Sequence, residues 1–145
     1  MIKRTPVPFS KRLNIAIKLC LLIMFVEVVN QFTGGFFRSF GILPRNIDGL
    51  SGILFAPFLH GGLVHLFSNL GPLFVFTLLL LSHGRTRFLL VFSSTALIGG
   101  LLVWFFGRNA NHIGMSGVIY GLVGYLVVAG FIRCEFKLFV ISCLV

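Results

Sequence analysis

Long apolar segments separated by short polar or basic turns dominate the chain. They cover residues 13–32, 63–81 and 88–106, followed by a fourth from Ser116 to about Ile132. Each approaches the ~20 residues that an α-helix needs to cross the hydrocarbon core of a bilayer. We therefore predict an all-α membrane protein with four full spans. A fifth apolar run, residues 138–145, is too short to cross the core at about 1.5 Å per residue, so we expect only a partial fifth span.

The segment 33–62, between the first two spans, has a different pattern. Glycines and prolines, among them Gly34, Gly35, Pro44 and Pro57, interrupt a series of phenylalanines. No uninterrupted stretch here is long enough to cross a bilayer. An aromatic segment broken in this way is typical of a loop whose short helices lie in the membrane interface.

Composition excludes an ordinary soluble domain. Hydrophobic residues make up 57% of the 145 residues and charged residues only 10%, which is far more apolar than the usual soluble balance. The three cysteines, Cys20, Cys134 and Cys143, have neither a CxxC nor a metal-ligand spacing. We expect no disulfide framework, and the sequence implies no metal and no other cofactor.

The net charge of +9 indicates membrane orientation rather than binding to nucleic acid. With a cytoplasmic amino-terminal tail, residues 1–12, nine of the twelve Lys and Arg residues fall inside and three outside. The positive-inside rule requires this asymmetry. We therefore expect a multi-pass protein of a bacterial plasma membrane with its amino terminus in the cytoplasm. The inner set is Lys3, Arg4, Lys11, Arg12, Lys18, Arg85, Arg87, Arg133 and Lys137, and the outer set is Arg38, Arg45 and Arg108.

The fourth span opens with the stretch Gly114-Met115-Ser116-Gly117. Ser116 and Tyr120 are one turn apart, so both project from the same helix face. The orientation above places Ser116 near the outer membrane surface. An alternative is simple helix packing, because small residues at three- and four-residue spacing suit close helix contact in lipid. Those residues are Gly114, Gly117, Gly121 and Gly124.

His65 and Asn69 form a second polar pair, four residues apart near the outer end of the second span. Polar side chains in a span are costly unless they face protein or water. A hydrogen bond between two helices would explain them. The alternative is an oxyanion hole, in which both groups donate hydrogen bonds to developing negative charge. Their shared depth with Ser116 favours the oxyanion hole.

The combination of His65-x-x-x-Asn69 with a GxSG serine and Tyr120 two spans later resembles the rhomboid intramembrane serine proteases. The resemblance extends from about residue 10 to residue 145 and includes the broken loop and the order of the spans. It implies a rhomboid-like bundle of transmembrane helices that hydrolyses peptide bonds in or near the membrane. The substrate would be a transmembrane protein, and the reaction would proceed through an acyl-enzyme.

The resemblance also implies a role for each residue of the motif. Ser116 would be the nucleophile, while His65, Asn69 and the backbone N–H of Ser116 would stabilise the oxyanion. Gly114 would help to line the substrate site. Tyr120 would stack beneath the catalytic histidine.

That histidine lies on a sixth span in the family, and we expect this chain to be incomplete before it. A serine without a base is a poor nucleophile at neutral pH. The four histidines present are weak substitutes. His112 lies in the turn before the serine, where we expect it to order the loop, and His65 is assigned to the oxyanion. His83 is on the inner side, and His60 is expected to hold the loop to the second span.

The sequence therefore predicts a cytoplasmic tail, residues 1–12, and a rhomboid-like membrane domain, residues 13–145, that stops before the sixth span. The predicted function is that of an intramembrane serine endopeptidase whose partners are a transmembrane protein substrate and the lipid bilayer. Two alternatives stay open. One is a catalytically inactive rhomboid-like protein that binds transmembrane helices, and the other is a small transporter or channel-associated protein. The oligomeric state is not predicted.

Overall fold

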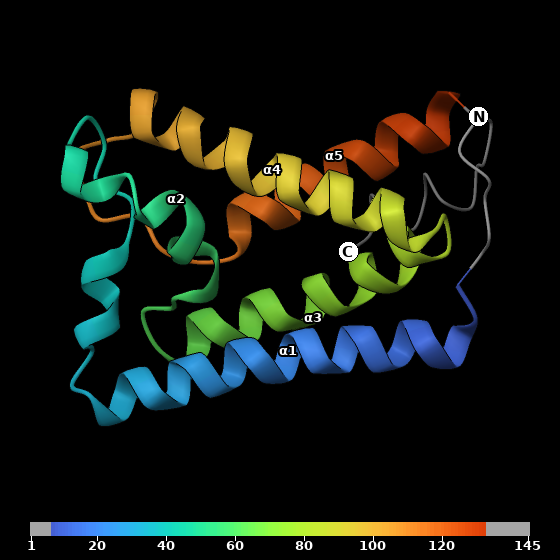
Figure 1. Ribbon diagram of the computed structural model, residues 1–145, viewed down its shortest axis with the longest axis horizontal. Helices are drawn as coiled ribbons and strands as arrows, with labels where there is room; N and C mark the ends of the chain where they lie inside the picture. Colours follow the sequence, from blue (N-terminus) through green and yellow to red (C-terminus); the bar gives the residue numbers. More distant parts are fainter. Residues whose placement is uncertain (1–6, 133–145) are drawn as a thin grey trace.

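Long helices and a loop of short helices make up the computed structural model, which describes residues 7–132 (Figure 1). The predicted all-α class is confirmed, since the described residues contain no strand beyond an isolated bridge between Ile42 and His112. The elements are α1 (Phe9–Phe32), η1 (Phe36–Phe40), η2 (Ile47–Gly49), α2 (Gly52–Phe55), η3 (Ala56–Phe58), α3 (Leu63–Leu81), α4 (Arg85–Phe106) and α5 (Ser116–Ile132).

Three of these helices, α1, α3 and α4, are long and apolar enough to cross a membrane. They contain the first three predicted spans. Helices α1 and α4 begin about one turn earlier than predicted, because basic residues such as Lys11 and Arg85 remain helical at the membrane surface. The fourth predicted span is α5, whose 17 described residues rise about 25 Å. The predicted partial fifth span lies outside the described residues.

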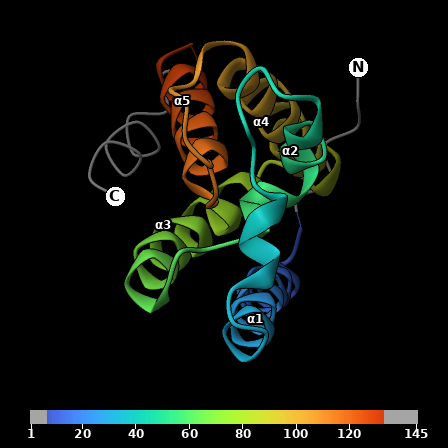
Figure 2. The ribbon, with the colours of Figure 1, turned by 90° about the vertical axis from the view of Figure 1, so that its left-hand side faces the viewer.

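Helix α3 is the centre of the arrangement. It packs beside α1 on one side and contacts α4 and α5 on the other. Figure 2, which looks at the loop end, shows α1 and α3 below and the pair α4 and α5 above. The short helices of the loop cross this end of the molecule and bring α2 against α4.

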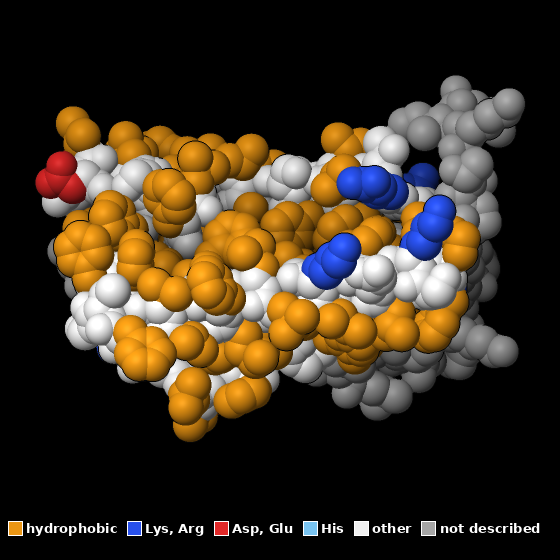
Figure 3. Space-filling view, turned by 60° about the horizontal axis from the view of Figure 1, so that its bottom comes forward, with side chains coloured by type: hydrophobic (Ala, Val, Ile, Leu, Met, Phe, Trp, Pro, Cys, Tyr) orange, Lys and Arg blue, Asp and Glu red, His pale blue; other side chains and the backbone are white. Residues whose placement is uncertain are grey.

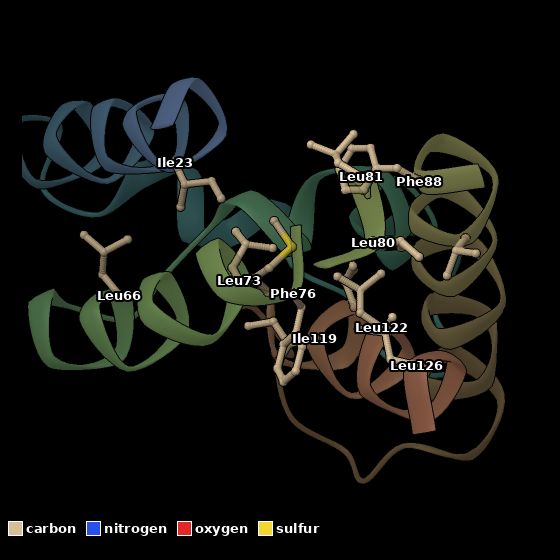
Figure 4. Close-up of a cluster of buried hydrophobic side chains, with 13 residues drawn as sticks. Ile23, Leu66, Leu73, Phe76, Leu80, Leu81, Phe88, Ile119, Leu122 and Leu126 are labelled. Atoms are coloured by element: carbon tan, nitrogen blue, oxygen red, sulfur yellow. The ribbon is translucent and has the colours of Figure 1, made fainter. Parts of the chain in front are cut away.

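The apolar core lies where α3 meets α5 (Figure 4). In lipid the core gains little from leaving water, so close van der Waals contact must hold the helices together. Phe76 is the largest of the fully buried side chains. Ile23 joins the core from α1, and Phe88 joins it from α4. The α3 and α5 members include Leu66, Leu73, Leu80, Ile119, Leu122 and Leu126.

The predicted glycine packing face is correct at only part of its length. A Cβ added to Gly121 would overlap Thr95 of α4, lying 2.6 Å from its Cβ, so these two helices touch through that glycine. Gly117 and Gly124 have no atom within 4 Å of such a Cβ in the described part of the chain. Gly114 lies before the helix rather than in it. The packing interpretation therefore explains Gly121 but not the glycines beside Ser116.

The loop is fastened to the end of α4 by hydrogen bonds. One Nη of Arg45 donates to the carbonyls of Phe105 and Gly107, at 3.2 and 2.9 Å, and the other donates to the Oδ1 of Asn109. These bonds satisfy carbonyls that a helix end leaves without partners. The indole N–H of Trp104 donates to the carbonyl of Asn46 at 2.8 Å.

The opposite side of the loop is fastened to α1. Asn30 and Glu27 are fully buried. The Oδ1 of Asn30 accepts the backbone N–H of Phe37 at 3.1 Å, and its Nδ2 donates to Glu27 at 3.3 Å. Arg38 forms an ion pair with Glu27 at 3.7 Å. Polar groups buried at this level of α1 thus serve the loop connection.

Candidate active site

Ser116 is the first residue of α5, and its hydroxyl faces α3. The Oγ donates a hydrogen bond to the Oδ1 of Asn69 at 2.9 Å, across 47 residues of sequence. Asn69 is buried, with 4% of its surface exposed, in the second turn of α3. The structure therefore brings together two of the residues that the sequence singled out.

The amide of Asn69 has a defined direction. Its Nδ2 donates to the carbonyl of His65, one turn earlier in α3, at 2.7 Å. Reversing the amide would place Oδ1 against that carbonyl, and two acceptors cannot bond each other. The contact with His65 therefore leaves Oδ1 facing the Ser116 hydroxyl. One hydrogen of the Nδ2 group is left for another acceptor.

The ring of His65 lies beside the serine. A Cβ added to Gly114 would lie 2.7 Å from both Cε1 and Nε2 of this ring and 3.8 Å from the Ser116 Oγ. On its other edge, Nδ1 accepts the backbone N–H of Gly61 at 3.3 Å. A neutral imidazole that accepts at Nδ1 carries its proton on Nε2. The edge nearest to Ser116 is therefore a hydrogen-bond donor.

Gly114 is required by its conformation as well as by space. Its φ of +115° is one that side chains with a Cβ rarely adopt, and its N–H donates to the carbonyl of Ala56 at 2.8 Å. This turn places the amino end of α5 directly at the His65 edge. The first amides of a helix have no acceptor within the helix, so the Ser116 N–H is available to an external oxygen.

A cavity of about 140 Å³ lies behind Ser116, between α4 and α5. Gly114, Gly117 and Val118 line it from the serine segment, and Thr95 and Gly99 line it from α4. The small residues at 114 and 117 therefore border open space as well as the serine. Tyr120 points away from this packing, with 75% of its surface exposed, and does not stack on a histidine in the described part of the chain.

The contacts of His112 and His83 lie away from Ser116. His112 exchanges two 2.9 Å backbone hydrogen bonds with Ile42, and its Nε2 lies 2.9 Å from the Arg108 carbonyl. It orders the loop, as expected. The Nδ1 of His83 lies 3.2 Å from the carbonyl of Leu79, at the opposite end of α3. Neither bonds Ser116.

His60 was expected only to hold the loop to the second span, and its contact with the site was not predicted. It is fully buried, and its ring packs edge-on against His65 with centroids 5.1 Å apart. Burial, reinforced by His65, lowers the pKa of His60 to about 4, although the Phe58 carbonyl and Glu27 act in the opposite direction. The five-residue spacing of the two histidines was visible in the sequence. Their ring contact depends on the fold of the Gly61-Gly62 turn.

Comparison with known proteins identifies the family. The family model for the Rhomboid domain matches residues 47–144, more than half of the chain. The chain belongs to the rhomboid family. The resemblance read from the motifs is thereby confirmed, and with the apolar helices it makes the chain an integral membrane protein. The roles of individual site residues stay predictions.

Several known proteins are about a third identical to this chain over the part that aligns. An uncharacterized protein of Mycobacterium tuberculosis is 37% identical over 119 residues, which cover 77% of this chain and 50% of the relative. One of Mycobacterium leprae is 35% identical over 131 residues, covering 86% and 51%. The inactive RHOMBOID-like protein 8 of Arabidopsis thaliana is 36% identical over 78 residues, covering 53% and 22%. The chain thus spans about half the length of the mycobacterial relatives, and no solved structure matches it significantly.

Proposed function

We propose that this chain carries the nucleophile and the oxyanion site of an intramembrane serine endopeptidase. The observation that supports the proposal most is the meeting of three groups at one point. The Ser116 hydroxyl bonds Asn69 at 2.9 Å, and the Nε2 edge of His65 lies over Gly114 beside the same hydroxyl. A packing role for these residues does not require a donor edge next to a serine.

In the proposed reaction, Ser116 attacks the carbonyl carbon of a peptide bond in or near a transmembrane segment of the substrate. Negative charge then develops on the carbonyl oxygen. The Nε2–H of His65, the backbone N–H of Ser116 and the second hydrogen of the Asn69 amide are the donors that stabilise it. Collapse of the tetrahedral intermediate releases the amine and leaves an acyl-enzyme, which water hydrolyses.

The base is the part of the mechanism that residues 7–132 do not supply. In these residues the Ser116 proton points to an amide oxygen, which is too weak a base to remove it. His65 cannot accept that proton at Nε2 while its Nδ1 accepts from Gly61. We propose that a histidine on a further span takes the proton and returns it to the leaving amine. In this proposal the membrane domain begins at residue 13, after a cytoplasmic tail at residues 1–12. Tyr120 would stack under that histidine.

The same observation favours a second candidate, a rhomboid-like protein that binds transmembrane helices without cleaving them. A serine hydroxyl bonded to an amide oxygen is at rest rather than activated. The name of the Arabidopsis relative records an inactive member of the family. In this candidate the helix bundle would bind a transmembrane helix, and the hydrogen-bond donors around Ser116 would have no catalytic role.

The proposed orientation places the amino terminus in the cytoplasm of a bacterium and Ser116 near the outer surface. Figure 3 supports it, since Lys and Arg side chains gather at the end opposite the loop and a broad apolar surface separates the two ends. The transmembrane substrate and the bilayer are then the proposed partners. No cofactor is part of the proposal.

The decisive experiment compares three proteins in detergent with a labelled transmembrane substrate. They are the 145-residue chain, a version lengthened by a sixth, histidine-bearing span, and the lengthened Ser116→Ala variant. We expect little or no cleavage by the 145-residue chain, cleavage by the lengthened version, and none by its Ser116→Ala variant. Cleavage that survives Ser116→Ala would remove Ser116 from the mechanism. A lengthened protein that binds the substrate but never cuts it would establish the second candidate instead.

A further inference from the structure

The contact between His60 and His65 has no part in the reaction as described. His60 precedes α3 and is completely buried, yet neither of its ring nitrogens makes a hydrogen bond of good geometry within residues 7–132, although the Phe58 carbonyl acts on the ring as an acceptor. Buried polar atoms are normally paired, because leaving them unpaired costs stability. A histidine held in this way at a stability cost is expected to have another use. What it touches is the ring of His65, edge-on at 5.1 Å and an interplanar angle of 64°.

The residue after His60 supplies the second contact with the same ring. The N–H of Gly61 donates to the Nδ1 of His65 at 3.3 Å. The turn continues through Gly62, which directly precedes α3. Its φ of +143° is accessible to glycine. One short turn therefore places a ring against the side of His65 and a donor against its Nδ1. The opposite edge is left facing Gly114 and Ser116.

We propose that His60 and the Gly61 N–H form a positioning unit that fixes both the ring plane and the tautomer of His65. The inference rests on the proposed function, in which His65 donates from Nε2 to the oxyanion. His60 does not reach the reacting atoms; its nearest described ring neighbour is His65. It acts by preventing the imidazole from turning over, which would put the Cε1–H in place of the Nε2–H at Ser116 and take Nδ1 away from the Gly61 N–H that fixes the tautomer.

The chemistry of His60 agrees with this role. Because burial lowers its pKa to about 4, the ring is uncharged at neutral pH. It can then contact the ring of His65 as a flat neutral ring. Phenylalanine offers the same flat ring without the unpaired nitrogens, whereas alanine leaves space in which the His65 ring can turn. Comparing His60→Phe with His60→Ala therefore separates the effect of ring contact from any effect of the histidine nitrogens.

The test is nuclear magnetic resonance of the 145-residue chain in detergent micelles at pH 7.5, with histidine labelled by ¹⁵N. The His65 signals are those that disappear in His65→Gln. We expect a single tautomer, protonated at Nε2, in the wild type and in His60→Phe. We expect a mixture of tautomers in His60→Ala. The matched control is Gly71→Ala in α3, whose added Cβ has no atom within 4 Å in the described part of the chain, so its spectrum should match the wild type.

The wild-type spectrum alone can overturn the proposal, so a variant that fails to fold does not leave it undecided. Protonation of His65 at Nδ1, or averaging between tautomers, would contradict it. An unchanged His65 signal in folded His60→Ala would remove His60 from the positioning unit. The measurement needs no catalysis. If the tautomer is fixed at Nε2–H and the lengthened protein never cleaves substrate, the proposed function is refuted and the positioning unit stays intact.

Discussion

The Ser116 hydroxyl donates a hydrogen bond to the Oδ1 of Asn69, which lies 2.9 Å away on α3. Asn69 is held in this direction because its Nδ2 bonds the carbonyl of His65. The hydroxyl hydrogen of Ser116 and the second hydrogen of the Asn69 Nδ2 group therefore lie close together. When a substrate carbonyl enters, the serine hydroxyl leaves Oδ1 to attack it, and the second hydrogen of the Asn69 Nδ2 group then serves the oxyanion. Asn69 has two successive uses in this scheme.

Removing the Asn69 amide should weaken catalysis more than folding. In the lengthened protein, Asn69→Ala is expected to lower kcat about 10²–10³-fold, the usual cost of one lost oxyanion donor. Ser68→Ala is the matched control, since the Ser68 hydroxyl also bonds the His65 carbonyl, at 2.8 Å, but faces outward. Steady-state cleavage of the labelled substrate measures both. Equal losses in the two variants would show that the effect comes from the helix rather than from the amide.

Replacing Gly114 should destabilise the turn before α5. In Gly114→Ala the new Cβ meets the His65 ring at 2.7 Å in a backbone with φ of +115°. We expect a loss of about 1–3 kcal/mol in the free energy of unfolding. Gly117→Ala, which adds a Cβ with no atom within 4 Å in the described part of the chain, should be close to neutral. Unfolding by sodium dodecyl sulfate in mixed micelles provides the comparison, and a harmless Gly114→Ala would contradict the contact with His65.

The packing of α5 against α4 should depend on Gly121 of α5 but not on Gly124. A Cβ at Gly121 would overlap the side chain of Thr95, so Gly121→Ala must push α5 away from α4. Overpacking of this kind costs about 1–3 kcal/mol. Gly124→Ala has open space around its Cβ within residues 7–132 and serves as the control. Thermal unfolding in detergent should show a lower Tm for the first variant only; identical Tm values would place the α4–α5 contact elsewhere.

Stability should fall on mild acidification because His60 is buried and neutral. Its pKa is about 4 in the folded chain against an ordinary 6.5, so the unfolded chain binds more protons between these values. The free energy of unfolding then decreases as pH falls from 6.5 towards 4, by at most about 1.4 kcal/mol per pH unit from this group. Detergent unfolding of the wild type and His60→Phe at pH 7 and 5 isolates the contribution. The same pH dependence in both proteins would exclude His60 as its source.

The membrane orientation can be tested with single cysteines placed at the two ends of α4. In a background with Cys20, Cys134 and Cys143 changed to serine, Thr86→Cys lies in the first turn of α4 and Arg108→Cys lies in the turn after it. An impermeant maleimide should label position 108 in intact cells and position 86 only after permeabilisation. The opposite pattern would invert the proposed topology.

Sequence reasoning located the polar pair and the serine because their positions follow from helix periodicity and membrane depth. His65 and Asn69 share a face at four-residue spacing, and the order of the spans sets their level with Ser116. The direction of the Asn69 amide was out of reach, since it depends on a competition between the His65 carbonyl and the Ser116 hydroxyl. The glycine face was overextended because spacing shows which residues share a face but not where the neighbouring helix diverges.

The fastenings of the loop were also invisible in the sequence. Arg45 was counted only as one of three outer charges, yet its guanidinium closes the end of α4. Its own backbone has a φ of +59°, a conformation that no pattern of apolar residues indicates. The hydrogen bond between Asn30 and the backbone of Phe37 likewise depends on the turn at Gly34 and Gly35. Long-range polar contacts of this kind follow from the folded path and not from local spacing.

The two-sided fastening of the loop determines how it can move. Asn30 ties one end to α1, while Arg45 and the Trp104 indole tie the other to α4. A segment held at both ends cannot swing open like a flap unless one of these sets of bonds breaks. It keeps the ends of α1 and α4 that lie beside the loop at a constant separation. Changes within it will therefore alter the spacing of α1 and α4 before they alter access to Ser116.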